Sequence, residues 1–161
     1  MDYIIREMHP SEYPLLAEFI CEAIYFGGKS LNDEQRAIVL ADPLCVAAFE
    51  GFGTRDDDLA LVAEVDGQLA GCCWARTVEE YGHIDDETPS LSIALFPQYR
   101  GQGIGTALMS RIIEELTAAG YTRISLSVDK DNPARHLYER LGFKIIGDGF
   151  DDTEWLMLRE Q

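Results

Sequence analysis

A glycine-rich turn between a strand and a helix is the feature that most constrains this chain. Residues 90–96 are largely apolar and predict a buried strand that ends at Pro97. Gly101, Gly103 and Gly105 follow, and a long helical pattern begins there. Glycine lets bare backbone N–H groups approach an anion closely, and the first N–H groups of a helix have no intrahelical partner. With the helix dipole, this arrangement predicts a site for a phosphate or pyrophosphate group.

Two common phosphate-binding motifs fit this turn less well. A Walker A loop needs Gly-Lys-Ser/Thr, but residues 103–106 read Gly-Ile-Gly-Thr, without a lysine. A dinucleotide-binding fold places such a turn in its first βα unit, whereas this turn lies past the middle of the chain. A tight turn without a ligand is the remaining alternative. Without a ligand, however, three glycines and Arg100 at the start of a helix would only lower the stability of the fold.

The rest of the chain predicts one sheet flanked by helices. Strands are expected at residues 3–6, 59–65, 68–78, 90–96, 121–128, 143–146 and 154–158. Helices are expected from residue 10 to the Gly27-Gly28 pair, and at 32–41, 43–50, 103–119 and 132–141. Asp66-Gly67 between two apolar runs predicts a hairpin. This order indicates a mixed α/β arrangement around one sheet.

Composition and length narrow the class of protein. The 161 residues, 47% of them apolar, suit a single domain over 1–161. There is no run of about 18 apolar residues and no signal-peptide pattern at the start, so a cytoplasmic protein without membrane contact is expected. The four cysteines form no C-x-x-C pair. We therefore expect reduced packing cysteines and no metal.

The net charge of −16 bears on the partners. It disfavours nucleic acid and anionic membranes, because phosphate contacts need clustered Lys and Arg. It favours a cationic small molecule or a basic peptide, although solubility alone also explains such a charge.

Two motifs carry a resemblance to a known family. Arg100, Gly103 and Gly105 match the pattern Arg/Gln-x-x-Gly-x-Gly/Ala after a strand. The second motif is an Asn, followed by a short helix that ends in Tyr and then by Gly-Phe. It is matched here by Asn132, Pro133, Ala134, Leu137, Tyr138, Leu141, Gly142 and Phe143. Over about residues 60–158 the sequence therefore resembles the GNAT-type N-acetyltransferase superfamily. The resemblance implies a GNAT-like acyl-CoA N-acyltransferase fold, a mixed α/β (α+β) fold whose central, mostly antiparallel sheet has about six to seven strands.

The resemblance also implies acetyl-CoA as co-substrate and a set of binding residues. Main-chain groups of Ile93, Ala94 and Leu95 would pair with the pantetheine arm, and the Leu95 N–H would polarise the acetyl carbonyl. Asn132 would hydrogen-bond the pantetheine region, and Tyr138 would protonate the leaving thiolate. The pyrophosphate would be held by N–H groups of Arg100, Gly101, Gln102, Gly103, Ile104, Gly105 and Thr106.

The two motifs do not identify the general base that would deprotonate the amine. The strand before the Asn132 helix offers Ser127, and the strand before the glycine turn offers Ser90 and Ser92, so neither supplies an acid. In the preceding loop, Glu87 is the first candidate and His83 the second. A water chain without a single base is the alternative.

The implied function is acetyl transfer to a primary amine of a small molecule or peptide. The alternative is a non-catalytic acyl-CoA-binding sensor of the same fold. The acidic runs at residues 56–58 and 85–87 would attract a cationic acceptor. The aromatic residues expected to wall the acceptor cleft are Tyr25, Phe26, Trp74 and Tyr81. A homodimer is common among relatives.

Overall fold

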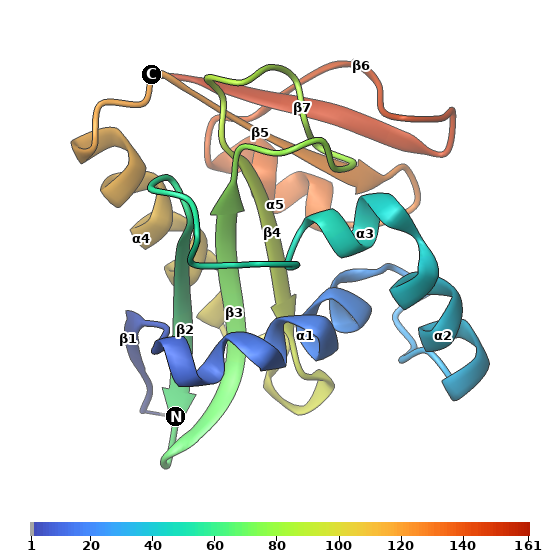
Figure 1. The fold of residues 1–161 in the computed structure, drawn as a ribbon, viewed down its shortest axis with the longest axis vertical. Coiled ribbons are helices and arrows are strands. Elements are labelled where there is room, and N and C mark those ends of the chain that lie inside the picture. The colour runs from blue at the N-terminus through green and yellow to red at the C-terminus, as the bar shows by residue number, and fades with distance from the viewer. Residues whose placement is uncertain (1) are drawn as a thin grey trace.

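Seven strands form one sheet in the computed structural model, which describes residues 2–161 (Figure 1). The strands are β1 (Ile4–Glu7), β2 (Leu59–Val65), β3 (Gln68–Arg76), β4 (Ser90–Leu95), β5 (Arg123–Asp129), β6 (Lys144–Asp148) and β7 (Glu154–Glu160). Across the sheet the order is β1-β2-β3-β4-β5-β7-β6. All neighbouring strands are antiparallel except β4 and β5. The expected mixed, mostly antiparallel sheet is confirmed.

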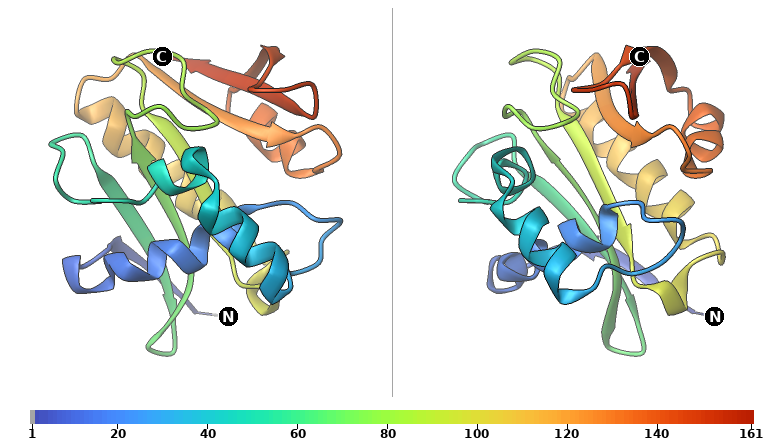
Figure 2. Two further views of the ribbon diagram at one scale, coloured as in Figure 1. Left: turned by 45° about the vertical axis from the view of Figure 1, so that its right-hand side comes forward. Right: turned by 90° about the vertical axis from the view of Figure 1, so that its right-hand side faces the viewer.

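Helices cover both faces of this sheet (Figure 2). They are α1 (Leu16–Ala23), α2 (Asp33–Ala41), α3 (Pro43–Ala47), α4 (Ile104–Ala118) and α5 (Ala134–Arg140), with short 3-10 helices at Pro10–Leu15 and Pro97–Tyr99. Helices α1 to α3 lie on one face, and α4 and α5 lie on the other. No helix within residues 2–161 is long and apolar enough to cross a lipid bilayer.

Each face of the sheet has its own hydrophobic core. On the face of α1, Leu16 and Phe19 pack with Val62 and Trp74. On the other face lies the inward stripe of α4, with Ile104, Leu108, Ile112 and Leu116 all buried. Successive side chains of a strand point to opposite faces, so Cys72 belongs to the first core and Cys73 to the second.

The N-terminal helices differ in part from their predicted bounds. Asn32 begins α2 as expected, since its Oδ1 accepts a hydrogen bond from the Gln35 N–H at 2.8 Å. Helix α1, however, ends at Ala23, before the expected stop at Gly27-Gly28, because Ile24 has an extended backbone (φ −76°, ψ 123°). Ile24 packs against the first core, so tertiary contacts rather than the glycines set this helix end.

A buried ion pair fastens the loop between α3 and β2. The Arg76 side chain is 5% exposed, and its Nε donates to Asp58 Oδ1 at 2.9 Å. Its other nitrogens donate to three carbonyls at and just beyond the end of α3, those of Ala47, Glu50 and Gly51. Asp58 therefore holds the loop together, and it does not serve as the surface charge that we expected to attract the acceptor.

The pairing of β4 with β5 creates a gap in the sheet. Ser90 and Ser125 form the parallel pair that the described residues show between these strands, and the Ser125 N–H donates to Pro89 O at 3.0 Å. Beyond this pair the two strands diverge (Figure 1). The second half of β4 therefore has an unpaired edge that faces β5.

Candidate functional site

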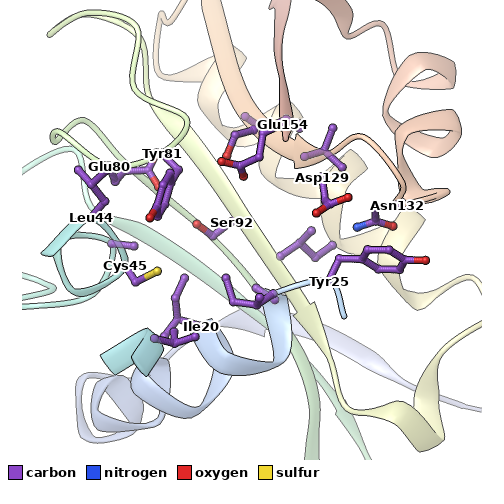
Figure 3. Close-up of a pocket in the computed structure, with 18 of the residues that line it drawn as sticks. Ile20, Tyr25, Leu44, Cys45, Glu80, Tyr81, Ser92, Asp129, Asn132 and Glu154 are labelled. Carbon is purple, nitrogen blue, oxygen red and sulfur yellow. The ribbon is translucent and has the colours of Figure 1, made fainter. Parts of the chain in front are cut away.

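Two adjoining hollows lie at the gap between β4 and β5. The first, which we call the acidic cavity, has a volume of about 330 Å³ (Figure 3). The carboxylates that define it are Asp42, Glu80, Asp129, Asp151 and Glu154. The second, the glycine groove, has about 300 Å³ and is defined by Lys29, Ile93, Ala94, Leu95, Arg100 and Gly105. Tyr25, Asn132 and Tyr138 are among the residues that line both, so the two hollows adjoin.

The start of α4 exposes free backbone donors near the glycine groove. Gly103 precedes the helix in the left-handed region (φ 85°), and the Ala107 N–H donates to its carbonyl at 3.1 Å. The N–H groups of residues 104–106 therefore precede the first intrahelical bond. Gly101 is also left-handed (φ 72°), and a Cβ at either glycine would meet no atom within 4 Å. The turn thus leaves room for an anion beside these donors.

Arg100 is positioned by two contacts at the edge of the glycine groove. Its Nε donates to Leu95 O at 3.0 Å, and its Nη2 lies 3.3 Å from Glu22 Oε2. Lys29 lines the same groove. The groove therefore carries cationic groups that suit an anionic ligand.

The unpaired edge of β4 offers main-chain groups to the gap. The Phe96 N–H donates to Ala70 O at 3.0 Å, toward β3, and Ala94 is paired with Cys72 of β3. Main-chain groups alternate in direction along a strand, so those of Ile93 and Leu95 face the gap. The Leu95 carbonyl already accepts a hydrogen bond from the Arg100 side chain. The N–H groups of Ile93 and Leu95 remain as donors, whereas the main chain of Ala94 is engaged with β3.

Tyr138 stands where the two hollows meet. It lies in α5, is 7% exposed and packs edge-on against the Phe143 ring at 6.4 Å between centroids. Burial raises the pKa of its hydroxyl well above the usual range, and Cys73 adds to this. The phenol is therefore protonated at neutral pH. Two residues before α5, Asn132 Oδ1 accepts a hydrogen bond from the N–H of Ala134, the first residue of the helix, at 2.9 Å.

Two carboxylates in the acidic cavity have raised pKa values. Burial raises the pKa of Glu80 to about 7, although the nearby Ser90 hydroxyl and the hydrogen bond from the Gly82 N–H (3.0 Å) counteract it. Burial is also the largest cause of the raised pKa of Glu154, to which nearby Asp residues add, while a hydrogen bond with Ser127 lowers it. Both carboxylates are thus desolvated and crowded by like charges.

The rim of the acidic cavity is held by a hydrogen bond between distant segments. The Tyr81 hydroxyl donates to Asp42 Oδ2, which joins the loop after β3 to the junction of α2 and α3. The Tyr81 ring also packs against Phe150 at 5.7 Å between centroids. Of the aromatic residues expected here, Tyr25 and Tyr81 line the cavity and Phe26 lines the groove. Trp74 does not reach either hollow, because α1 and α3 cover it and its Nε1 donates to Ala48 O.

The acidic cavity has no basic counterpart among its described lining residues, which include no Lys, Arg or His. Nor does any group of three or more His, Cys, Asp and Glu within residues 2–161 form an arrangement that could hold a metal ion. A positively charged organic group therefore suits this cavity.

The expected base candidates lie outside both hollows. Glu87 is exposed, and its N–H donates to Asp85 Oδ1 at 2.9 Å. The His83 Nε2 lies 3.6 Å from Asp86. Neither Glu87 nor His83 lines the cavity or the groove. Glu80 and Glu154 were not predicted from the sequence, and the signal that could have found Glu154 is an acid at the start of an apolar strand.

Comparisons with known proteins agree on one family. The sequence model of the acetyltransferase (GNAT) family matches residues 28–143. An acetyltransferase of Pectobacterium atrosepticum is 35% identical over 93 residues, which are 57% of this chain and 62% of the relative. One of Sodalis glossinidius is 36% identical over 92 residues, or 56% and 61%. The matches thus span about three fifths of the length of these curated relatives.

Solved structures show the same fold. A GNAT-family acetyltransferase of Streptococcus pneumoniae has a TM-score of 0.69 at 23% identity, with 99% of both chains covered. The PaiA N-acetyltransferase of Thermoplasma acidophilum, solved in complex with coenzyme A, has a TM-score of 0.70 at 20% identity over the whole of both chains. At this identity the likeness concerns the fold.

Proposed function

The chain belongs to the GNAT acetyltransferase family, and we propose that it transfers the acetyl group of acetyl-CoA to a primary amine. The transfer takes place by direct attack of the amine on the thioester, in a single domain over residues 1–161. One observation carries the proposal: Tyr138 and Asn132 line both the glycine groove and the acidic cavity. A cofactor in the groove and an amine in the cavity would meet at these residues.

The glycine groove suits the cofactor. N–H groups of residues 101–106 bind the pyrophosphate; this is supported by Gly105, which lines the groove, and by the N–H groups of 104–106, which precede the first intrahelical bond. Arg100 and Lys29 supply positive charge at the same groove. The pantetheine arm lies along the open edge of β4, where the Ile93 and Leu95 N–H groups are free to bind it.

The acidic cavity suits the acceptor. An alkylamine with a lysine-like pKa near 10.4 is mostly protonated at neutral pH, and an ammonium group would offset part of the negative charge of the five carboxylates. Before it can attack, the ammonium must lose a proton, which costs about 4 to 5 kcal/mol at pH 7 for roughly 3.4 pH units at 1.36 kcal/mol each. We therefore propose a small molecule or peptide with a cationic amine as acceptor.

The chemical step uses groups of this chain at the gap. The Leu95 N–H donates to the acetyl oxygen as negative charge develops on it. Tyr138, which is protonated at neutral pH, donates its proton to the departing thiolate. The four free cysteines are buried and fit a reducing compartment, so we propose the cytoplasm as the location.

An acceptor screen tests this function. The full chain is incubated with acetyl-CoA and polyamines, aminoglycosides, amino acids or peptides with a free N-terminus, and released thiol is measured. We expect turnover with at least one cationic amine. Coenzyme A binding without turnover on any amine would instead favour the sensor function.

A further inference from the structure

We propose that Glu154 is the general base of the acetyl transfer, taking a proton from the acceptor ammonium in the acidic cavity. This inference rests on the proposed acetyltransferase function, because it assigns a role within that reaction. Glu154 is the first residue of β7 and lines the cavity next to the groove. Strand β5 presents Ser127 and Asp129 to the same cavity.

The position of Glu154 places its carboxylate over the gap between β4 and β5. In the sheet it is paired with Asp129 of β5, and the Ser127 hydroxyl lowers the pKa of its carboxylate. In Figure 3 the carboxylate points into the cavity between Ser92 of β4 and Asp129. Glu154 and Tyr138 line the same cavity, so an ammonium group bound in it shares the cavity with this carboxylate.

The other four carboxylates of the cavity form hydrogen bonds that stabilise nearby turns and loops. Each accepts a hydrogen bond from a group of the chain itself: Asp42 from the Tyr81 hydroxyl, Glu80 from the Gly82 N–H, Asp129 from the Asp131 N–H and Asp151 from the Thr153 N–H. All five lack an ion pair within residues 2–161, but the Glu154 carboxylate differs in accepting no backbone N–H there, and only the Ser127 hydroxyl lowers its pKa. Its carboxylate is therefore free to exchange a proton.

The surroundings of Glu154 make it a stronger base than an exposed glutamate. The charged and titratable groups around it are Asp42 and Cys45 near α3, Glu80 and Tyr81 in the loop after β3, Asp129 in β5 and Asp151 before β7. None of them is a cation. Burial and the neighbouring acids raise the pKa of Glu154, which brings its proton affinity closer to that of the amine.

The proton balance closes with two groups of this chain. Glu154 takes one proton from the ammonium, and the neutral amine forms the new C–N bond while the carbonyl π bond opens to the oxyanion. The C–S bond breaks when this tetrahedral intermediate collapses. The nitrogen of the tetrahedral intermediate loses a second proton. Tyr138 gives its own proton to the thiolate and recovers one from that nitrogen, while Glu154 releases its proton to solvent. The products are the amide, the free thiol of coenzyme A and one proton.

The variant Glu154→Gln tests the assignment through its pH profile. We expect kcat/KM for the amine to fall by about 100-fold or more at pH 7, the lower end of the effect of a general base. The loss should shrink as the pH approaches the pKa of the amine, because free amine is then abundant. The KM for acetyl-CoA should not change. Glu160→Gln, an exposed acid of the same strand, is the matched control and should keep wild-type rates.

A rescue separates a base from a merely structural residue. Ser127→Glu in the Glu154→Gln background returns a carboxylate to the same place from β5, and it should recover at least about tenfold of the lost rate. Wild-type activity of Glu154→Gln, an equal loss at every pH, or a loss of that size in Glu87→Gln instead would overturn the proposal. Failure of the proposed function looks different, because the wild-type chain would then acetylate no amine in the screen.

Discussion

Ser90 of β4 and Ser125 of β5 are paired in parallel at the point from which the two strands separate. The pair anchors one end of the gap, and the Ser125 Oγ also donates to Gly82 O at 2.7 Å, which ties down the loop after β3. Glu80, in that loop, thereby keeps its place in the acidic cavity. The separation of β4 and β5 thus creates both the free edge of β4 and the meeting point of the two hollows.

Removal of the Tyr138 hydroxyl should slow the chemistry without weakening cofactor binding. We expect Tyr138→Phe to lower kcat by about 10- to 100-fold, because the thiolate then leaves without its proton donor. The ring and its packing on Phe143 are kept, so the Kd for coenzyme A should stay within a factor of two, roughly 0.4 kcal/mol. Steady-state kinetics and calorimetry check the two parts, and an unchanged kcat would refute the role of Tyr138.

A methyl group at Gly103 should weaken coenzyme A binding. The residue has φ 85°, and an added Cβ would point into the open space beside the free N–H groups. We expect Gly103→Ala to raise the Kd for coenzyme A at least tenfold, about 1.4 kcal/mol. Gly120→Ala, with φ 99° and equally open surroundings beyond the end of α4, controls for the cost of the left-handed backbone. Equal effects of both variants on the Kd would rule out a specific role of Gly103 in binding.

Glu80 should make the fold less stable as the pH rises. Its pKa of about 7 in the folded protein exceeds the ordinary value of 4.5, so the folded state binds more protons between these limits. Its contribution is therefore complete below about pH 4.5 and is lost by about pH 7. We expect Glu80→Gln to raise the free energy of unfolding by about 2 to 3 kcal/mol at pH 8, but little at pH 4. Urea unfolding at both pH values measures this, and an equal gain at each would count against it.

The Arg76–Asp58 pair should matter for stability. Asp58→Asn leaves a guanidinium buried without its counter-charge, and we expect a loss of about 3 to 5 kcal/mol in the free energy of unfolding. Asp56→Asn, in the same loop but exposed, should change it by less than about 0.5 kcal/mol. Denaturant unfolding compares the two variants. If both variants changed the free energy of unfolding by a similar small amount, the Arg76–Asp58 pair would not be needed to stabilise the loop.

Local chemistry made much of the fold predictable. The Asp66-Gly67 turn adopts positive φ at both residues (51° and 79°), and β2 ends and β3 begins at the predicted positions. Gly103 and Gly120 flank α4, as their places in the sequence indicated. In each case neighbouring residues alone determine the backbone, so the sequence pattern is sufficient.

The acidic cavity was not predictable in this way. Asp42, Glu80 and Glu154 belong to segments that are far apart in the chain, and only the packing of α3, the loop after β3 and β7 brings them together. The acidic runs that stand out in the sequence have other roles, since Asp58 binds Arg76 and Asp85 binds Arg123. Charge density along a chain does not show which carboxylates will be desolvated in one cavity.

Binding of coenzyme A at the glycine groove is what the proposed reaction depends on, and calorimetric titration of coenzyme A into the full chain measures it. We expect saturable binding with one molecule per chain, and a loss of affinity in Gly103→Ala but not in Gly120→Ala. No measurable heat at millimolar concentrations, or binding that is indifferent to Gly103, would show that the groove does not hold the cofactor.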